Sequence, residues 1–151
     1  MQRKLEKSIL AADVISGAIL LLMLYASISK LLDYNRFKAV LLQSPVIASG
    51  GKYIAVIIPS VELILSIFLF MHKTRPKALF YSLILVVIFT LYITIMVLTV
   101  SRPDLPCACG ALFESIGWPY HILINLAIIL LCILGLALYQ NRRNLPARSP
   151  P

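Results

Sequence analysis

The stretch LFYSLILVVIFTLYITIMVLTV, Leu79–Val100, is a run of 22 residues without a charged side chain. The hydrocarbon core of a bilayer is about 30 Å thick and a helix rises about 1.5 Å per residue, so about 20 apolar residues cross it. This run is therefore long enough to span a membrane as one helix. Outer-membrane strands alternate apolar and polar residues over about 10 positions, which this run does not do.

Three other segments have a similar length and composition: Ile9–Ser29, Tyr53–Met71 and Tyr120–Tyr139. With the first run they fill more than half of the 151 residues and leave no room for a separate soluble domain. We predict an all-α integral membrane protein with one membrane domain, residues 1–151, built as a four-transmembrane-helix bundle. A cleaved signal peptide is the less favoured interpretation of the first segment, because its apolar run exceeds the usual length of about 7–15 residues.

The composition excludes the common soluble classes. Hydrophobic residues make up 60% of the chain and charged residues 13%, and the mean hydropathy is +0.92, whereas an average soluble domain has about 25% charged residues. A disordered chain is poor in aliphatic residues, so disorder is excluded as well. The net charge of +8 comes from Lys and Arg between the apolar segments. That arrangement orients membrane proteins and does not predict nucleic-acid binding, so the expected surroundings are the lipid bilayer.

The distribution of Lys and Arg predicts the orientation in that bilayer. The amino end, the second loop and the carboxyl tail share one side of a four-helix path and hold nine basic residues: Arg3, Lys4, Lys7, Lys73, Arg75, Lys77, Arg142, Arg143 and Arg148. The opposite side holds five: Lys30, Arg36, Lys38, Lys52 and Arg102. The positive-inside rule then places both termini in the cytoplasm, for a multi-pass protein of a bacterial inner membrane.

Cys107 and Cys109 lie in the third loop, residues 101–119, on the predicted periplasmic side. That side is oxidising, so disulfides form and persist there. Cα atoms two residues apart are separated by at most about 7 Å, the limit for a disulfide, so the closed pair would be strained and easily reduced. We favour a redox-active pair; half of a metal site, or two thiols without a role, are the alternatives. Cys132, inside the last apolar segment, is expected to be a packing residue.

Glu62 lies roughly 13–14 Å below the predicted outer start of its helix, counting nine residues at 1.5 Å each. An ionised carboxylate is costly there, so Glu62 is expected to be protonated or paired, with Thr90 and Thr94 as candidate donors. A functional interpretation is a proton relay or a hydrogen bond to a quinone carbonyl; the structural one is a protonated acid that joins helices. Pro59, one turn earlier, offers a kink that could open a pocket.

His121 and Asn125 are four residues apart at the start of the last segment and so share one helix face, with Cys132 nearly in register. Such a polar stripe is expected to face other helices rather than lipid. His121 could shuttle a proton or help to hold a thiolate near the cysteine pair. Alternatively, it lies in an aromatic belt beside Trp118 and Tyr120.

Two boundary features complete the predicted topology. Apolar side chains recur at helical spacing over about residues 31–44, which predicts an amphipathic helix on the outer surface that ends before Pro45. Asp13 lies about one turn inside its apolar run from the inner side. We expect it to be a boundary residue that is solvated or paired with Lys7.

Three stretches resemble DoxX-like membrane proteins. They are Tyr25–Asp33 with Phe37, the Pro-x-x-Glu motif in Ile58–Leu63, and Cys107–Gly110 followed by Ile116–His121 and Asn125. The third is similar to the MauE branch, and the resemblance covers most of residues 15–138 with all four helices in order. It implies kinship with the four-helix architecture of the vitamin K epoxide reductase and DsbB families, which pass thiol electrons to or from a quinone.

MauE proteins are implicated in the maturation of methylamine dehydrogenase, whose small subunit needs many disulfides and a thioredoxin-like helper. The resemblance implies that Cys107 and Cys109 exchange electrons between a periplasmic thioredoxin-like partner and a membrane quinone, which supports maturation of an exported client protein. Glu62, His121 and Asn125 are then candidate quinone ligands or proton handlers, and no metal is expected.

The chain also departs from the quinone-linked families. Those enzymes usually carry a Cys-x-x-Cys pair and often a second loop pair, whereas this chain has one Cys-x-Cys, so it must exchange directly with the thiols of its partner. The alternatives are a non-enzymatic scaffold or chaperone for a maturation complex, and a soft-metal carrier for copper or mercury.

Overall fold

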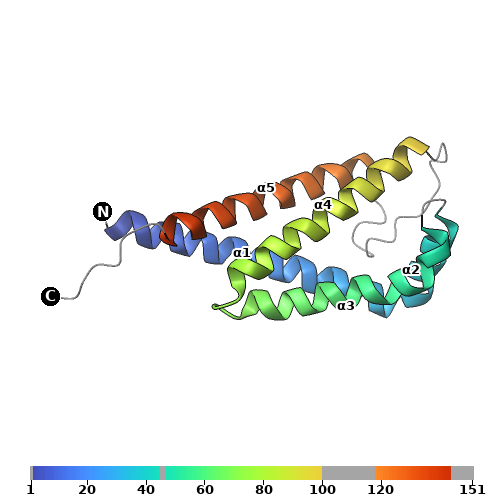
Figure 1. Ribbon diagram of the computed structural model, residues 1–151, viewed down its shortest axis with the longest axis horizontal. Coiled ribbons are helices and arrows are strands. Elements are labelled where there is room, and N and C mark those ends of the chain that lie inside the picture. The colour runs from blue at the N-terminus through green and yellow to red at the C-terminus, as the bar shows by residue number, and fades with distance from the viewer. Residues whose placement is uncertain (1, 45–46, 100–117, 144–151) are drawn as a thin grey trace.

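The computed structural model describes residues 2–44, 47–99 and 118–143 (Figure 1). Its elements are α1 (Gln2–Leu32), α2 (Tyr34–Gln43), the short 3-10 helix η1 (Ala48–Gly50), α3 (Gly51–Phe70), α4 (Arg75–Thr99) and α5 (Trp118–Arg143). These described residues include no strand. Four helices, α1, α3, α4 and α5, are long and apolar enough to cross a membrane, which confirms the predicted all-α class with four spans.

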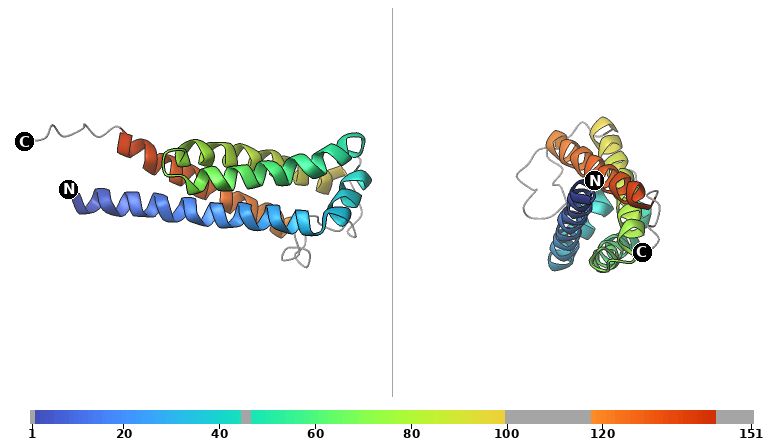
Figure 2. Two further views of the ribbon diagram at one scale, coloured as in Figure 1. Left: turned by 90° about the horizontal axis from the view of Figure 1, so that it is seen from below. Right: turned by 90° about the vertical axis from the view of Figure 1, so that its left-hand side faces the viewer.

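The four long helices form an elongated bundle in which the chain passes back and forth (Figures 1 and 2). α1 packs along α3 and α5, and α4 packs along the same two helices, so each long helix has two main neighbours. The start of α1 and the end of α5 lie at one end, which we call the terminal end. α2 lies at the opposite end, which we call the α2 end (Figure 1).

The outer surface of the bundle is apolar. Between 22% and 33% of the most hydrophobic stretch of each long helix is buried against the rest of the protein. Large side chains stay exposed, for example Leu98 at 79% and Phe70 at 74%. Soluble monomers rarely show contiguous apolar patches of more than a few hundred Å², so a surface of this kind is expected where the surrounding solvent is lipid.

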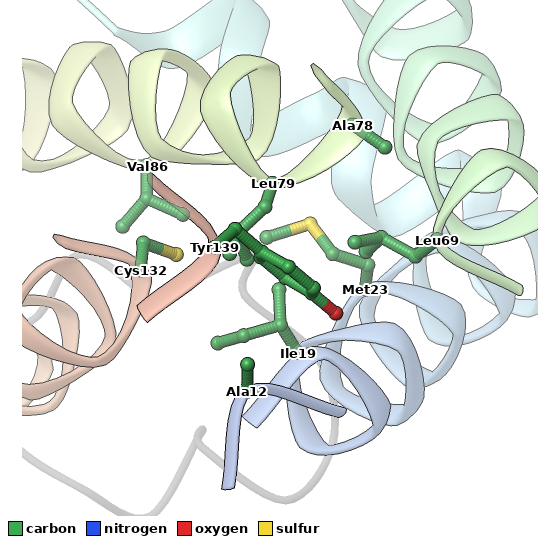
Figure 3. Packing of buried hydrophobic residues seen from close by; sticks show 9 residues of the cluster. All are labelled: Ala12, Ile19, Met23, Leu69, Ala78, Leu79, Val86, Cys132 and Tyr139. Carbon is green, nitrogen blue, oxygen red and sulfur yellow. The ribbon is translucent and has the colours of Figure 1, made fainter. Parts of the chain in front are cut away.

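An apolar core joins all four long helices (Figure 3). Its buried members are Ala12, Ile19, Met23, Leu69, Ala78, Leu79, Val86, Cys132 and Tyr139. Cys132 is fully buried here, as expected for a packing residue. Gly135 allows α5 to approach closely, because a Cβ at this position would lie 2.7 Å from Leu79 Cδ2 and 3.2 Å from Ile15 Cγ2. Small residues at helix contacts are typical of membrane bundles.

The helices extend beyond several of the apolar runs. α1 was expected over residues 9–29 but continues to Leu32, and α4 begins at Arg75 rather than at residue 79. Hydropathy marks the apolar stretch of a helix, whereas the backbone hydrogen bonds continue into the polar residues at each end. The consequence for the site is that Lys30 lies inside α1 and not in a loop.

α2 covers the α2 end of the bundle. Phe37 and Leu41 are buried and pack against Ala55 of α3. The helix ends at Gln43, and Ser44 has extended backbone angles, φ −71° and ψ 126°. A proline disfavours the helical conformation in the residue before it, so Pro45 explains this end.

Candidate functional site

Glu62 forms a buried ion pair with Lys30. Lys30 lies near the end of α1 and Glu62 in the middle of α3, and Lys30 Nζ is 2.7 Å from Oε1 and 2.9 Å from Oε2. The two residues are 4% and 8% exposed. The ammonium therefore donates to both carboxylate oxygens, and of the two states expected for Glu62 the structure shows the paired one.

The Lys30 side chain reaches back along its own helix. Its Nζ lies 3.4 Å from the Ala26 carbonyl oxygen, one turn earlier. Side chains on a helix tilt toward its amino end, and a lysine stem is long and apolar, so a residue near the helix end can place its charge deeper. The ring centroids of Phe37 and Phe89 are 6.0 and 5.9 Å from Nζ, within reach of a cation–π interaction.

A cavity of about 90 Å³ lies beside this ion pair and is lined by all four long helices. Its polar lining residues are Lys30, Glu62, His121 and Asn125. The other lining residues are apolar: Leu22, Met23, Ala26, Leu85, Val86, Phe89, Ile124 and Ile128. The structure thus brings together the three residues selected from the sequence as quinone ligands or proton handlers, and adds Lys30 to them. Their chemical roles stay predictions.

Asn125 lines this cavity and carries a buried donor without a described partner. The residue is 9% exposed, and its Nδ2 has no hydrogen-bond partner among the described residues. A buried donor without a partner costs about 1–3 kcal/mol, so such groups usually meet water or a ligand. The cavity therefore suits a group that accepts hydrogen bonds, such as a carbonyl oxygen or water.

His121 faces the bundle interior. It is 4% exposed and lines the cavity, whereas its neighbour Tyr120 is 62% exposed. A residue of an aromatic belt sits at the lipid–water interface, so the burial of His121 favours the polar-stripe interpretation. An imidazole at this position can both accept and donate a proton.

A second, apolar pocket adjoins the polar cavity. It has a volume of about 250 Å³ and shares Glu62, Leu85 and Phe89 with the cavity. The remaining walls come from α2, α3, α4 and the segment before η1: Phe37, Leu41, Ile47, Ile54, Ile58, Ile88 and Tyr92. A cavity with four polar lining residues thus meets an almost wholly apolar pocket at Glu62.

The predicted donors to Glu62 were wrong. Thr90 Oγ1 donates to the Val86 carbonyl at 2.6 Å, and Thr94 Oγ1 donates to the Thr90 carbonyl at 2.8 Å. A threonine in a helix commonly bonds the carbonyl one turn earlier, which removes its proton from other acceptors. The partner is Lys30, which had been counted as a loop charge. The signal that could have found it is that a carboxylate in a membrane needs a cation.

Pro59 joins α3 to α1. α3 continues through it, and its carbonyl accepts a hydrogen bond of 2.8 Å from Ser27 Oγ of α1. Pro59 and Ser27 are both buried, and Pro59 lines neither cavity. It is therefore a contact point between α1 and α3, and its role in opening a pocket stays a prediction.

A separate polar cluster lies toward the terminal end around Asp13. Asp13 Oδ1 accepts hydrogen bonds from Arg75 Nη1 at 2.8 Å and from the Tyr139 hydroxyl at 2.9 Å. Arg75 Nε also donates to the Leu69 carbonyl at 3.0 Å. Asp13 is thus not merely solvated at a boundary; it joins α1, α4 and α5, with Arg75 as its cationic partner.

Cys107 and Cys109 lie outside the described residues, so their redox role stays a prediction. Within the ranges that the structure describes, no group of three or more His, Cys, Asp or Glu side chains could hold a metal ion.

A family model with the description Methylamine utilisation protein MauE matches residues 8–138. The chain belongs to the MauE family. This confirms the resemblance to MauE, and the match includes the residues around both cavities. No curated protein and no solved structure matches the chain significantly. Family and fold together describe a membrane-embedded MauE protein with a polar cavity inside its bundle.

Proposed function

We propose that this MauE-family protein is a thiol–disulfide redox protein of the bacterial inner membrane. Cys107 and Cys109 exchange with a periplasmic thioredoxin-like partner that serves an exported client protein, and a membrane quinone exchanges the electrons. The observation that carries the proposal is the cavity, in which a buried ion pair and two polar side chains of α5 converge inside an apolar bundle. Ionisable residues inside a membrane usually serve function, because they are costly to keep there.

We also propose an orientation of the bundle in the membrane. The start of α1 and the end of α5 lie at the same end of the bundle (Figure 1), and nine of the 14 basic residues are on that side of the four-helix path. The positive-inside rule makes it the cytoplasmic side. The α2 end then faces the periplasm, where thioredoxin-like partners meet oxidising conditions.

The covalent chain limits how far the cysteine pair is from the cavity. Cys107 and Cys109 precede Trp118, where α5 begins, by eleven and nine positions. An extended residue spans at most about 3.6 Å, so both cysteines stay within about 40 Å of the start of α5. His121 lies one turn into that helix. The chain therefore tethers the pair to the start of the helix that carries His121 and Asn125.

The lining residues fit a quinone chemically. A quinone carbonyl accepts hydrogen bonds, and Asn125 Nδ2 is a buried donor without a described partner; the Lys30–Glu62 ion pair lies on the wall of the same cavity. The adjoining apolar pocket offers carbon surface for an isoprenoid tail. A bound quinone would take up the two electrons and two protons that two thiols release when they close to a disulfide.

The protein's own groups supply positioning and proton transfer. Glu62 fixes the Lys30 ammonium on the cavity wall through both carboxylate oxygens. Asn125 Nδ2 would hold the acceptor, and the imidazole of His121 would carry protons between the cavity and the α2 end. The apolar wall residues keep bulk water away, which strengthens each of these electrostatic interactions.

The test uses purified protein in a Cys132→Ser background. Cys107 and Cys109 are reduced, a short-chain ubiquinone or menaquinone analogue is added without oxygen, and free thiols and quinol are measured together. We expect one quinol for each pair of thiols lost, none in the Cys107→Ser/Cys109→Ser variant, and slow reaction in Asn125→Leu. Leu126→Ala, an exposed position on α5, is the matched control and should react normally. Folded protein whose thiols stay reduced would overturn the proposal and favour the scaffold.

A further inference from the structure

A third pocket lies between the second half of α3 and the first half of α4. Its volume is about 290 Å³, and it shares no lining residue with the two cavities at Glu62. The residues that form it include Val61, Leu65 and Phe68 of α3 and Lys77, Ala78 and Tyr81 of α4. Apart from the lysine, these side chains offer an almost wholly apolar wall.

The depth of this pocket matches one leaflet of a bilayer. It runs from the α3–α4 turn back to Val61, nine residues before the end of α3 at Phe70. Nine helical residues rise about 13–14 Å, close to half of a hydrocarbon core of about 30 Å. Lipid chains of one leaflet occupy this depth.

Two lysines without a described ion-pair partner lie where the pocket meets the α3–α4 turn. Lys73 in the turn and Lys77 at the pocket wall are both exposed, and neither forms an ion pair with a described residue. The carboxylate of Asp13 is already bound by Arg75 and Tyr139. Two lysines beside an apolar pocket at the end of a span are complementary to an anionic lipid headgroup.

The turn that carries these lysines is fixed to the end of α3. Arg75 Nη2 donates to the Phe70 carbonyl at 3.3 Å, and Arg75 Nε donates to the Leu69 carbonyl at 3.0 Å. Thr74 Oγ1 donates to the Phe68 carbonyl at 2.7 Å. These bonds occupy the last carbonyls of α3, so the backbone between the two lysines is held in place beside the pocket.

We propose that this groove binds an anionic glycerophospholipid, with one acyl chain in the pocket and the phosphate near Lys73 and Lys77. The apolar depth alone suits any phospholipid, and the two lysines select the anionic one. The site is separate from the proposed redox function, and it holds whichever side of the membrane the terminal end faces.

The experiment compares spin-labelled phosphatidylglycerol with spin-labelled phosphatidylcholine of the same chain length, bound to the full-length protein in phosphatidylcholine nanodiscs. Lys73→Gln/Lys77→Gln removes the charge at the mouth. Ile64→Trp narrows the pocket from an exposed position on its wall. Lys52→Gln, at the α2 end, and Ile67→Trp, an exposed α3 residue that does not line the pocket, are the matched controls.

We expect the wild type to retain phosphatidylglycerol preferentially, and the preference to fall about five-fold for each lysine removed. Ile64→Trp should weaken retention of both lipids, and the two controls should behave as the wild type. Equal retention of the two lipids by the wild type would overturn the site. So would an equal loss in Lys52→Gln, which would show general surface attraction, or an unchanged Ile64→Trp, which would show that no chain enters the pocket.

Discussion

Lys30 of α1 and Glu62 of α3 hold each other through two short hydrogen bonds of 2.7 and 2.9 Å inside an apolar bundle. The same helix pair is joined by the bond from Ser27 to the Pro59 carbonyl. Because both charges are buried, forming the pair costs desolvation free energy. Removing only one partner destabilises the protein more, because it leaves a buried charge without compensation. It also forms one wall of the polar cavity and thus connects stability with the proposed chemistry.

Lys30→Met should destabilise the protein, because Glu62 then loses its partner while it stays buried. Removing one partner of a buried ion pair costs about 3–5 kcal/mol, whereas replacing both with apolar side chains is often neutral. We therefore expect Lys30→Met/Glu62→Met to recover most of the loss. The free energy of unfolding in mixed detergent micelles is the measurement, with the exposed Lys52→Met as control. Equal losses in the single and double variants would show that the charge pairing does not matter.

Gly135 and Gly17 should respond differently to alanine. A Cβ on Gly135 would lie 2.7 Å from Leu79 Cδ2, in the packed core, whereas nothing lies within 4 Å of a Cβ on Gly17. Both variants gain helix propensity, but the first must displace a fully buried leucine. We expect Gly135→Ala to be less stable than Gly17→Ala by about 1–3 kcal/mol. Equal unfolding free energies would place α5 farther from α4 than described.

Tyr139→Phe should weaken the cluster around Asp13. The variant removes the hydroxyl that donates to Asp13 Oδ1 at 2.9 Å and leaves the ring in the core. A hydrogen bond to a charged group contributes about 1.5–3 kcal/mol. Tyr120→Phe is the control, because Tyr120 is exposed near the other end of the same helix. If both variants unfold at the same denaturant concentration as the wild type, the bond from Tyr139 to Asp13 contributes nothing to stability.

Asn125→Leu should separate stability from function. Replacing an unsatisfied buried amide with an apolar side chain of similar size leaves no donor unpaired, so stability should stay equal or rise. The reaction of the cysteine pair with quinone should slow, because the quinone carbonyl loses the hydrogen-bond donor proposed for it. Unfolding and thiol oxidation are measured on the same preparation. A loss of more than about 1 kcal/mol in stability would mean that Nδ2 has a structural partner after all.

The fold was predictable because each span carries its own signal. Leu79–Val100 has no charge, and its length alone predicts a span, independent of its neighbours. Glu62, His121 and Asn125 were found for a related reason, since a polar residue in an apolar run stands out. They line one cavity because such residues turn inward, away from lipid.

The partners of these residues were not predictable in the same way. Lys30 follows an apolar run, where a lysine usually faces the headgroup region, and only the packing of α1 on α3 brings its ammonium to Glu62. Arg75 was counted as a loop charge for orientation, yet it bonds Asp13, which is 62 residues away in the chain. Hydropathy gives the depth of a residue but not the rotation of its helix, and the rotation decides such pairs.

The redox state of Cys107 and Cys109 in intact membranes tests the redox proposal most directly. A membrane-impermeant maleimide is applied with and without prior reduction, in a Cys132→Ser background that removes the buried thiol. An outward-facing disulfide predicts labelling only after reduction, and loss of that labelling when quinone is supplied again. Cysteines that label without reduction, and still label after treatment with an oxidant, would contradict the redox role.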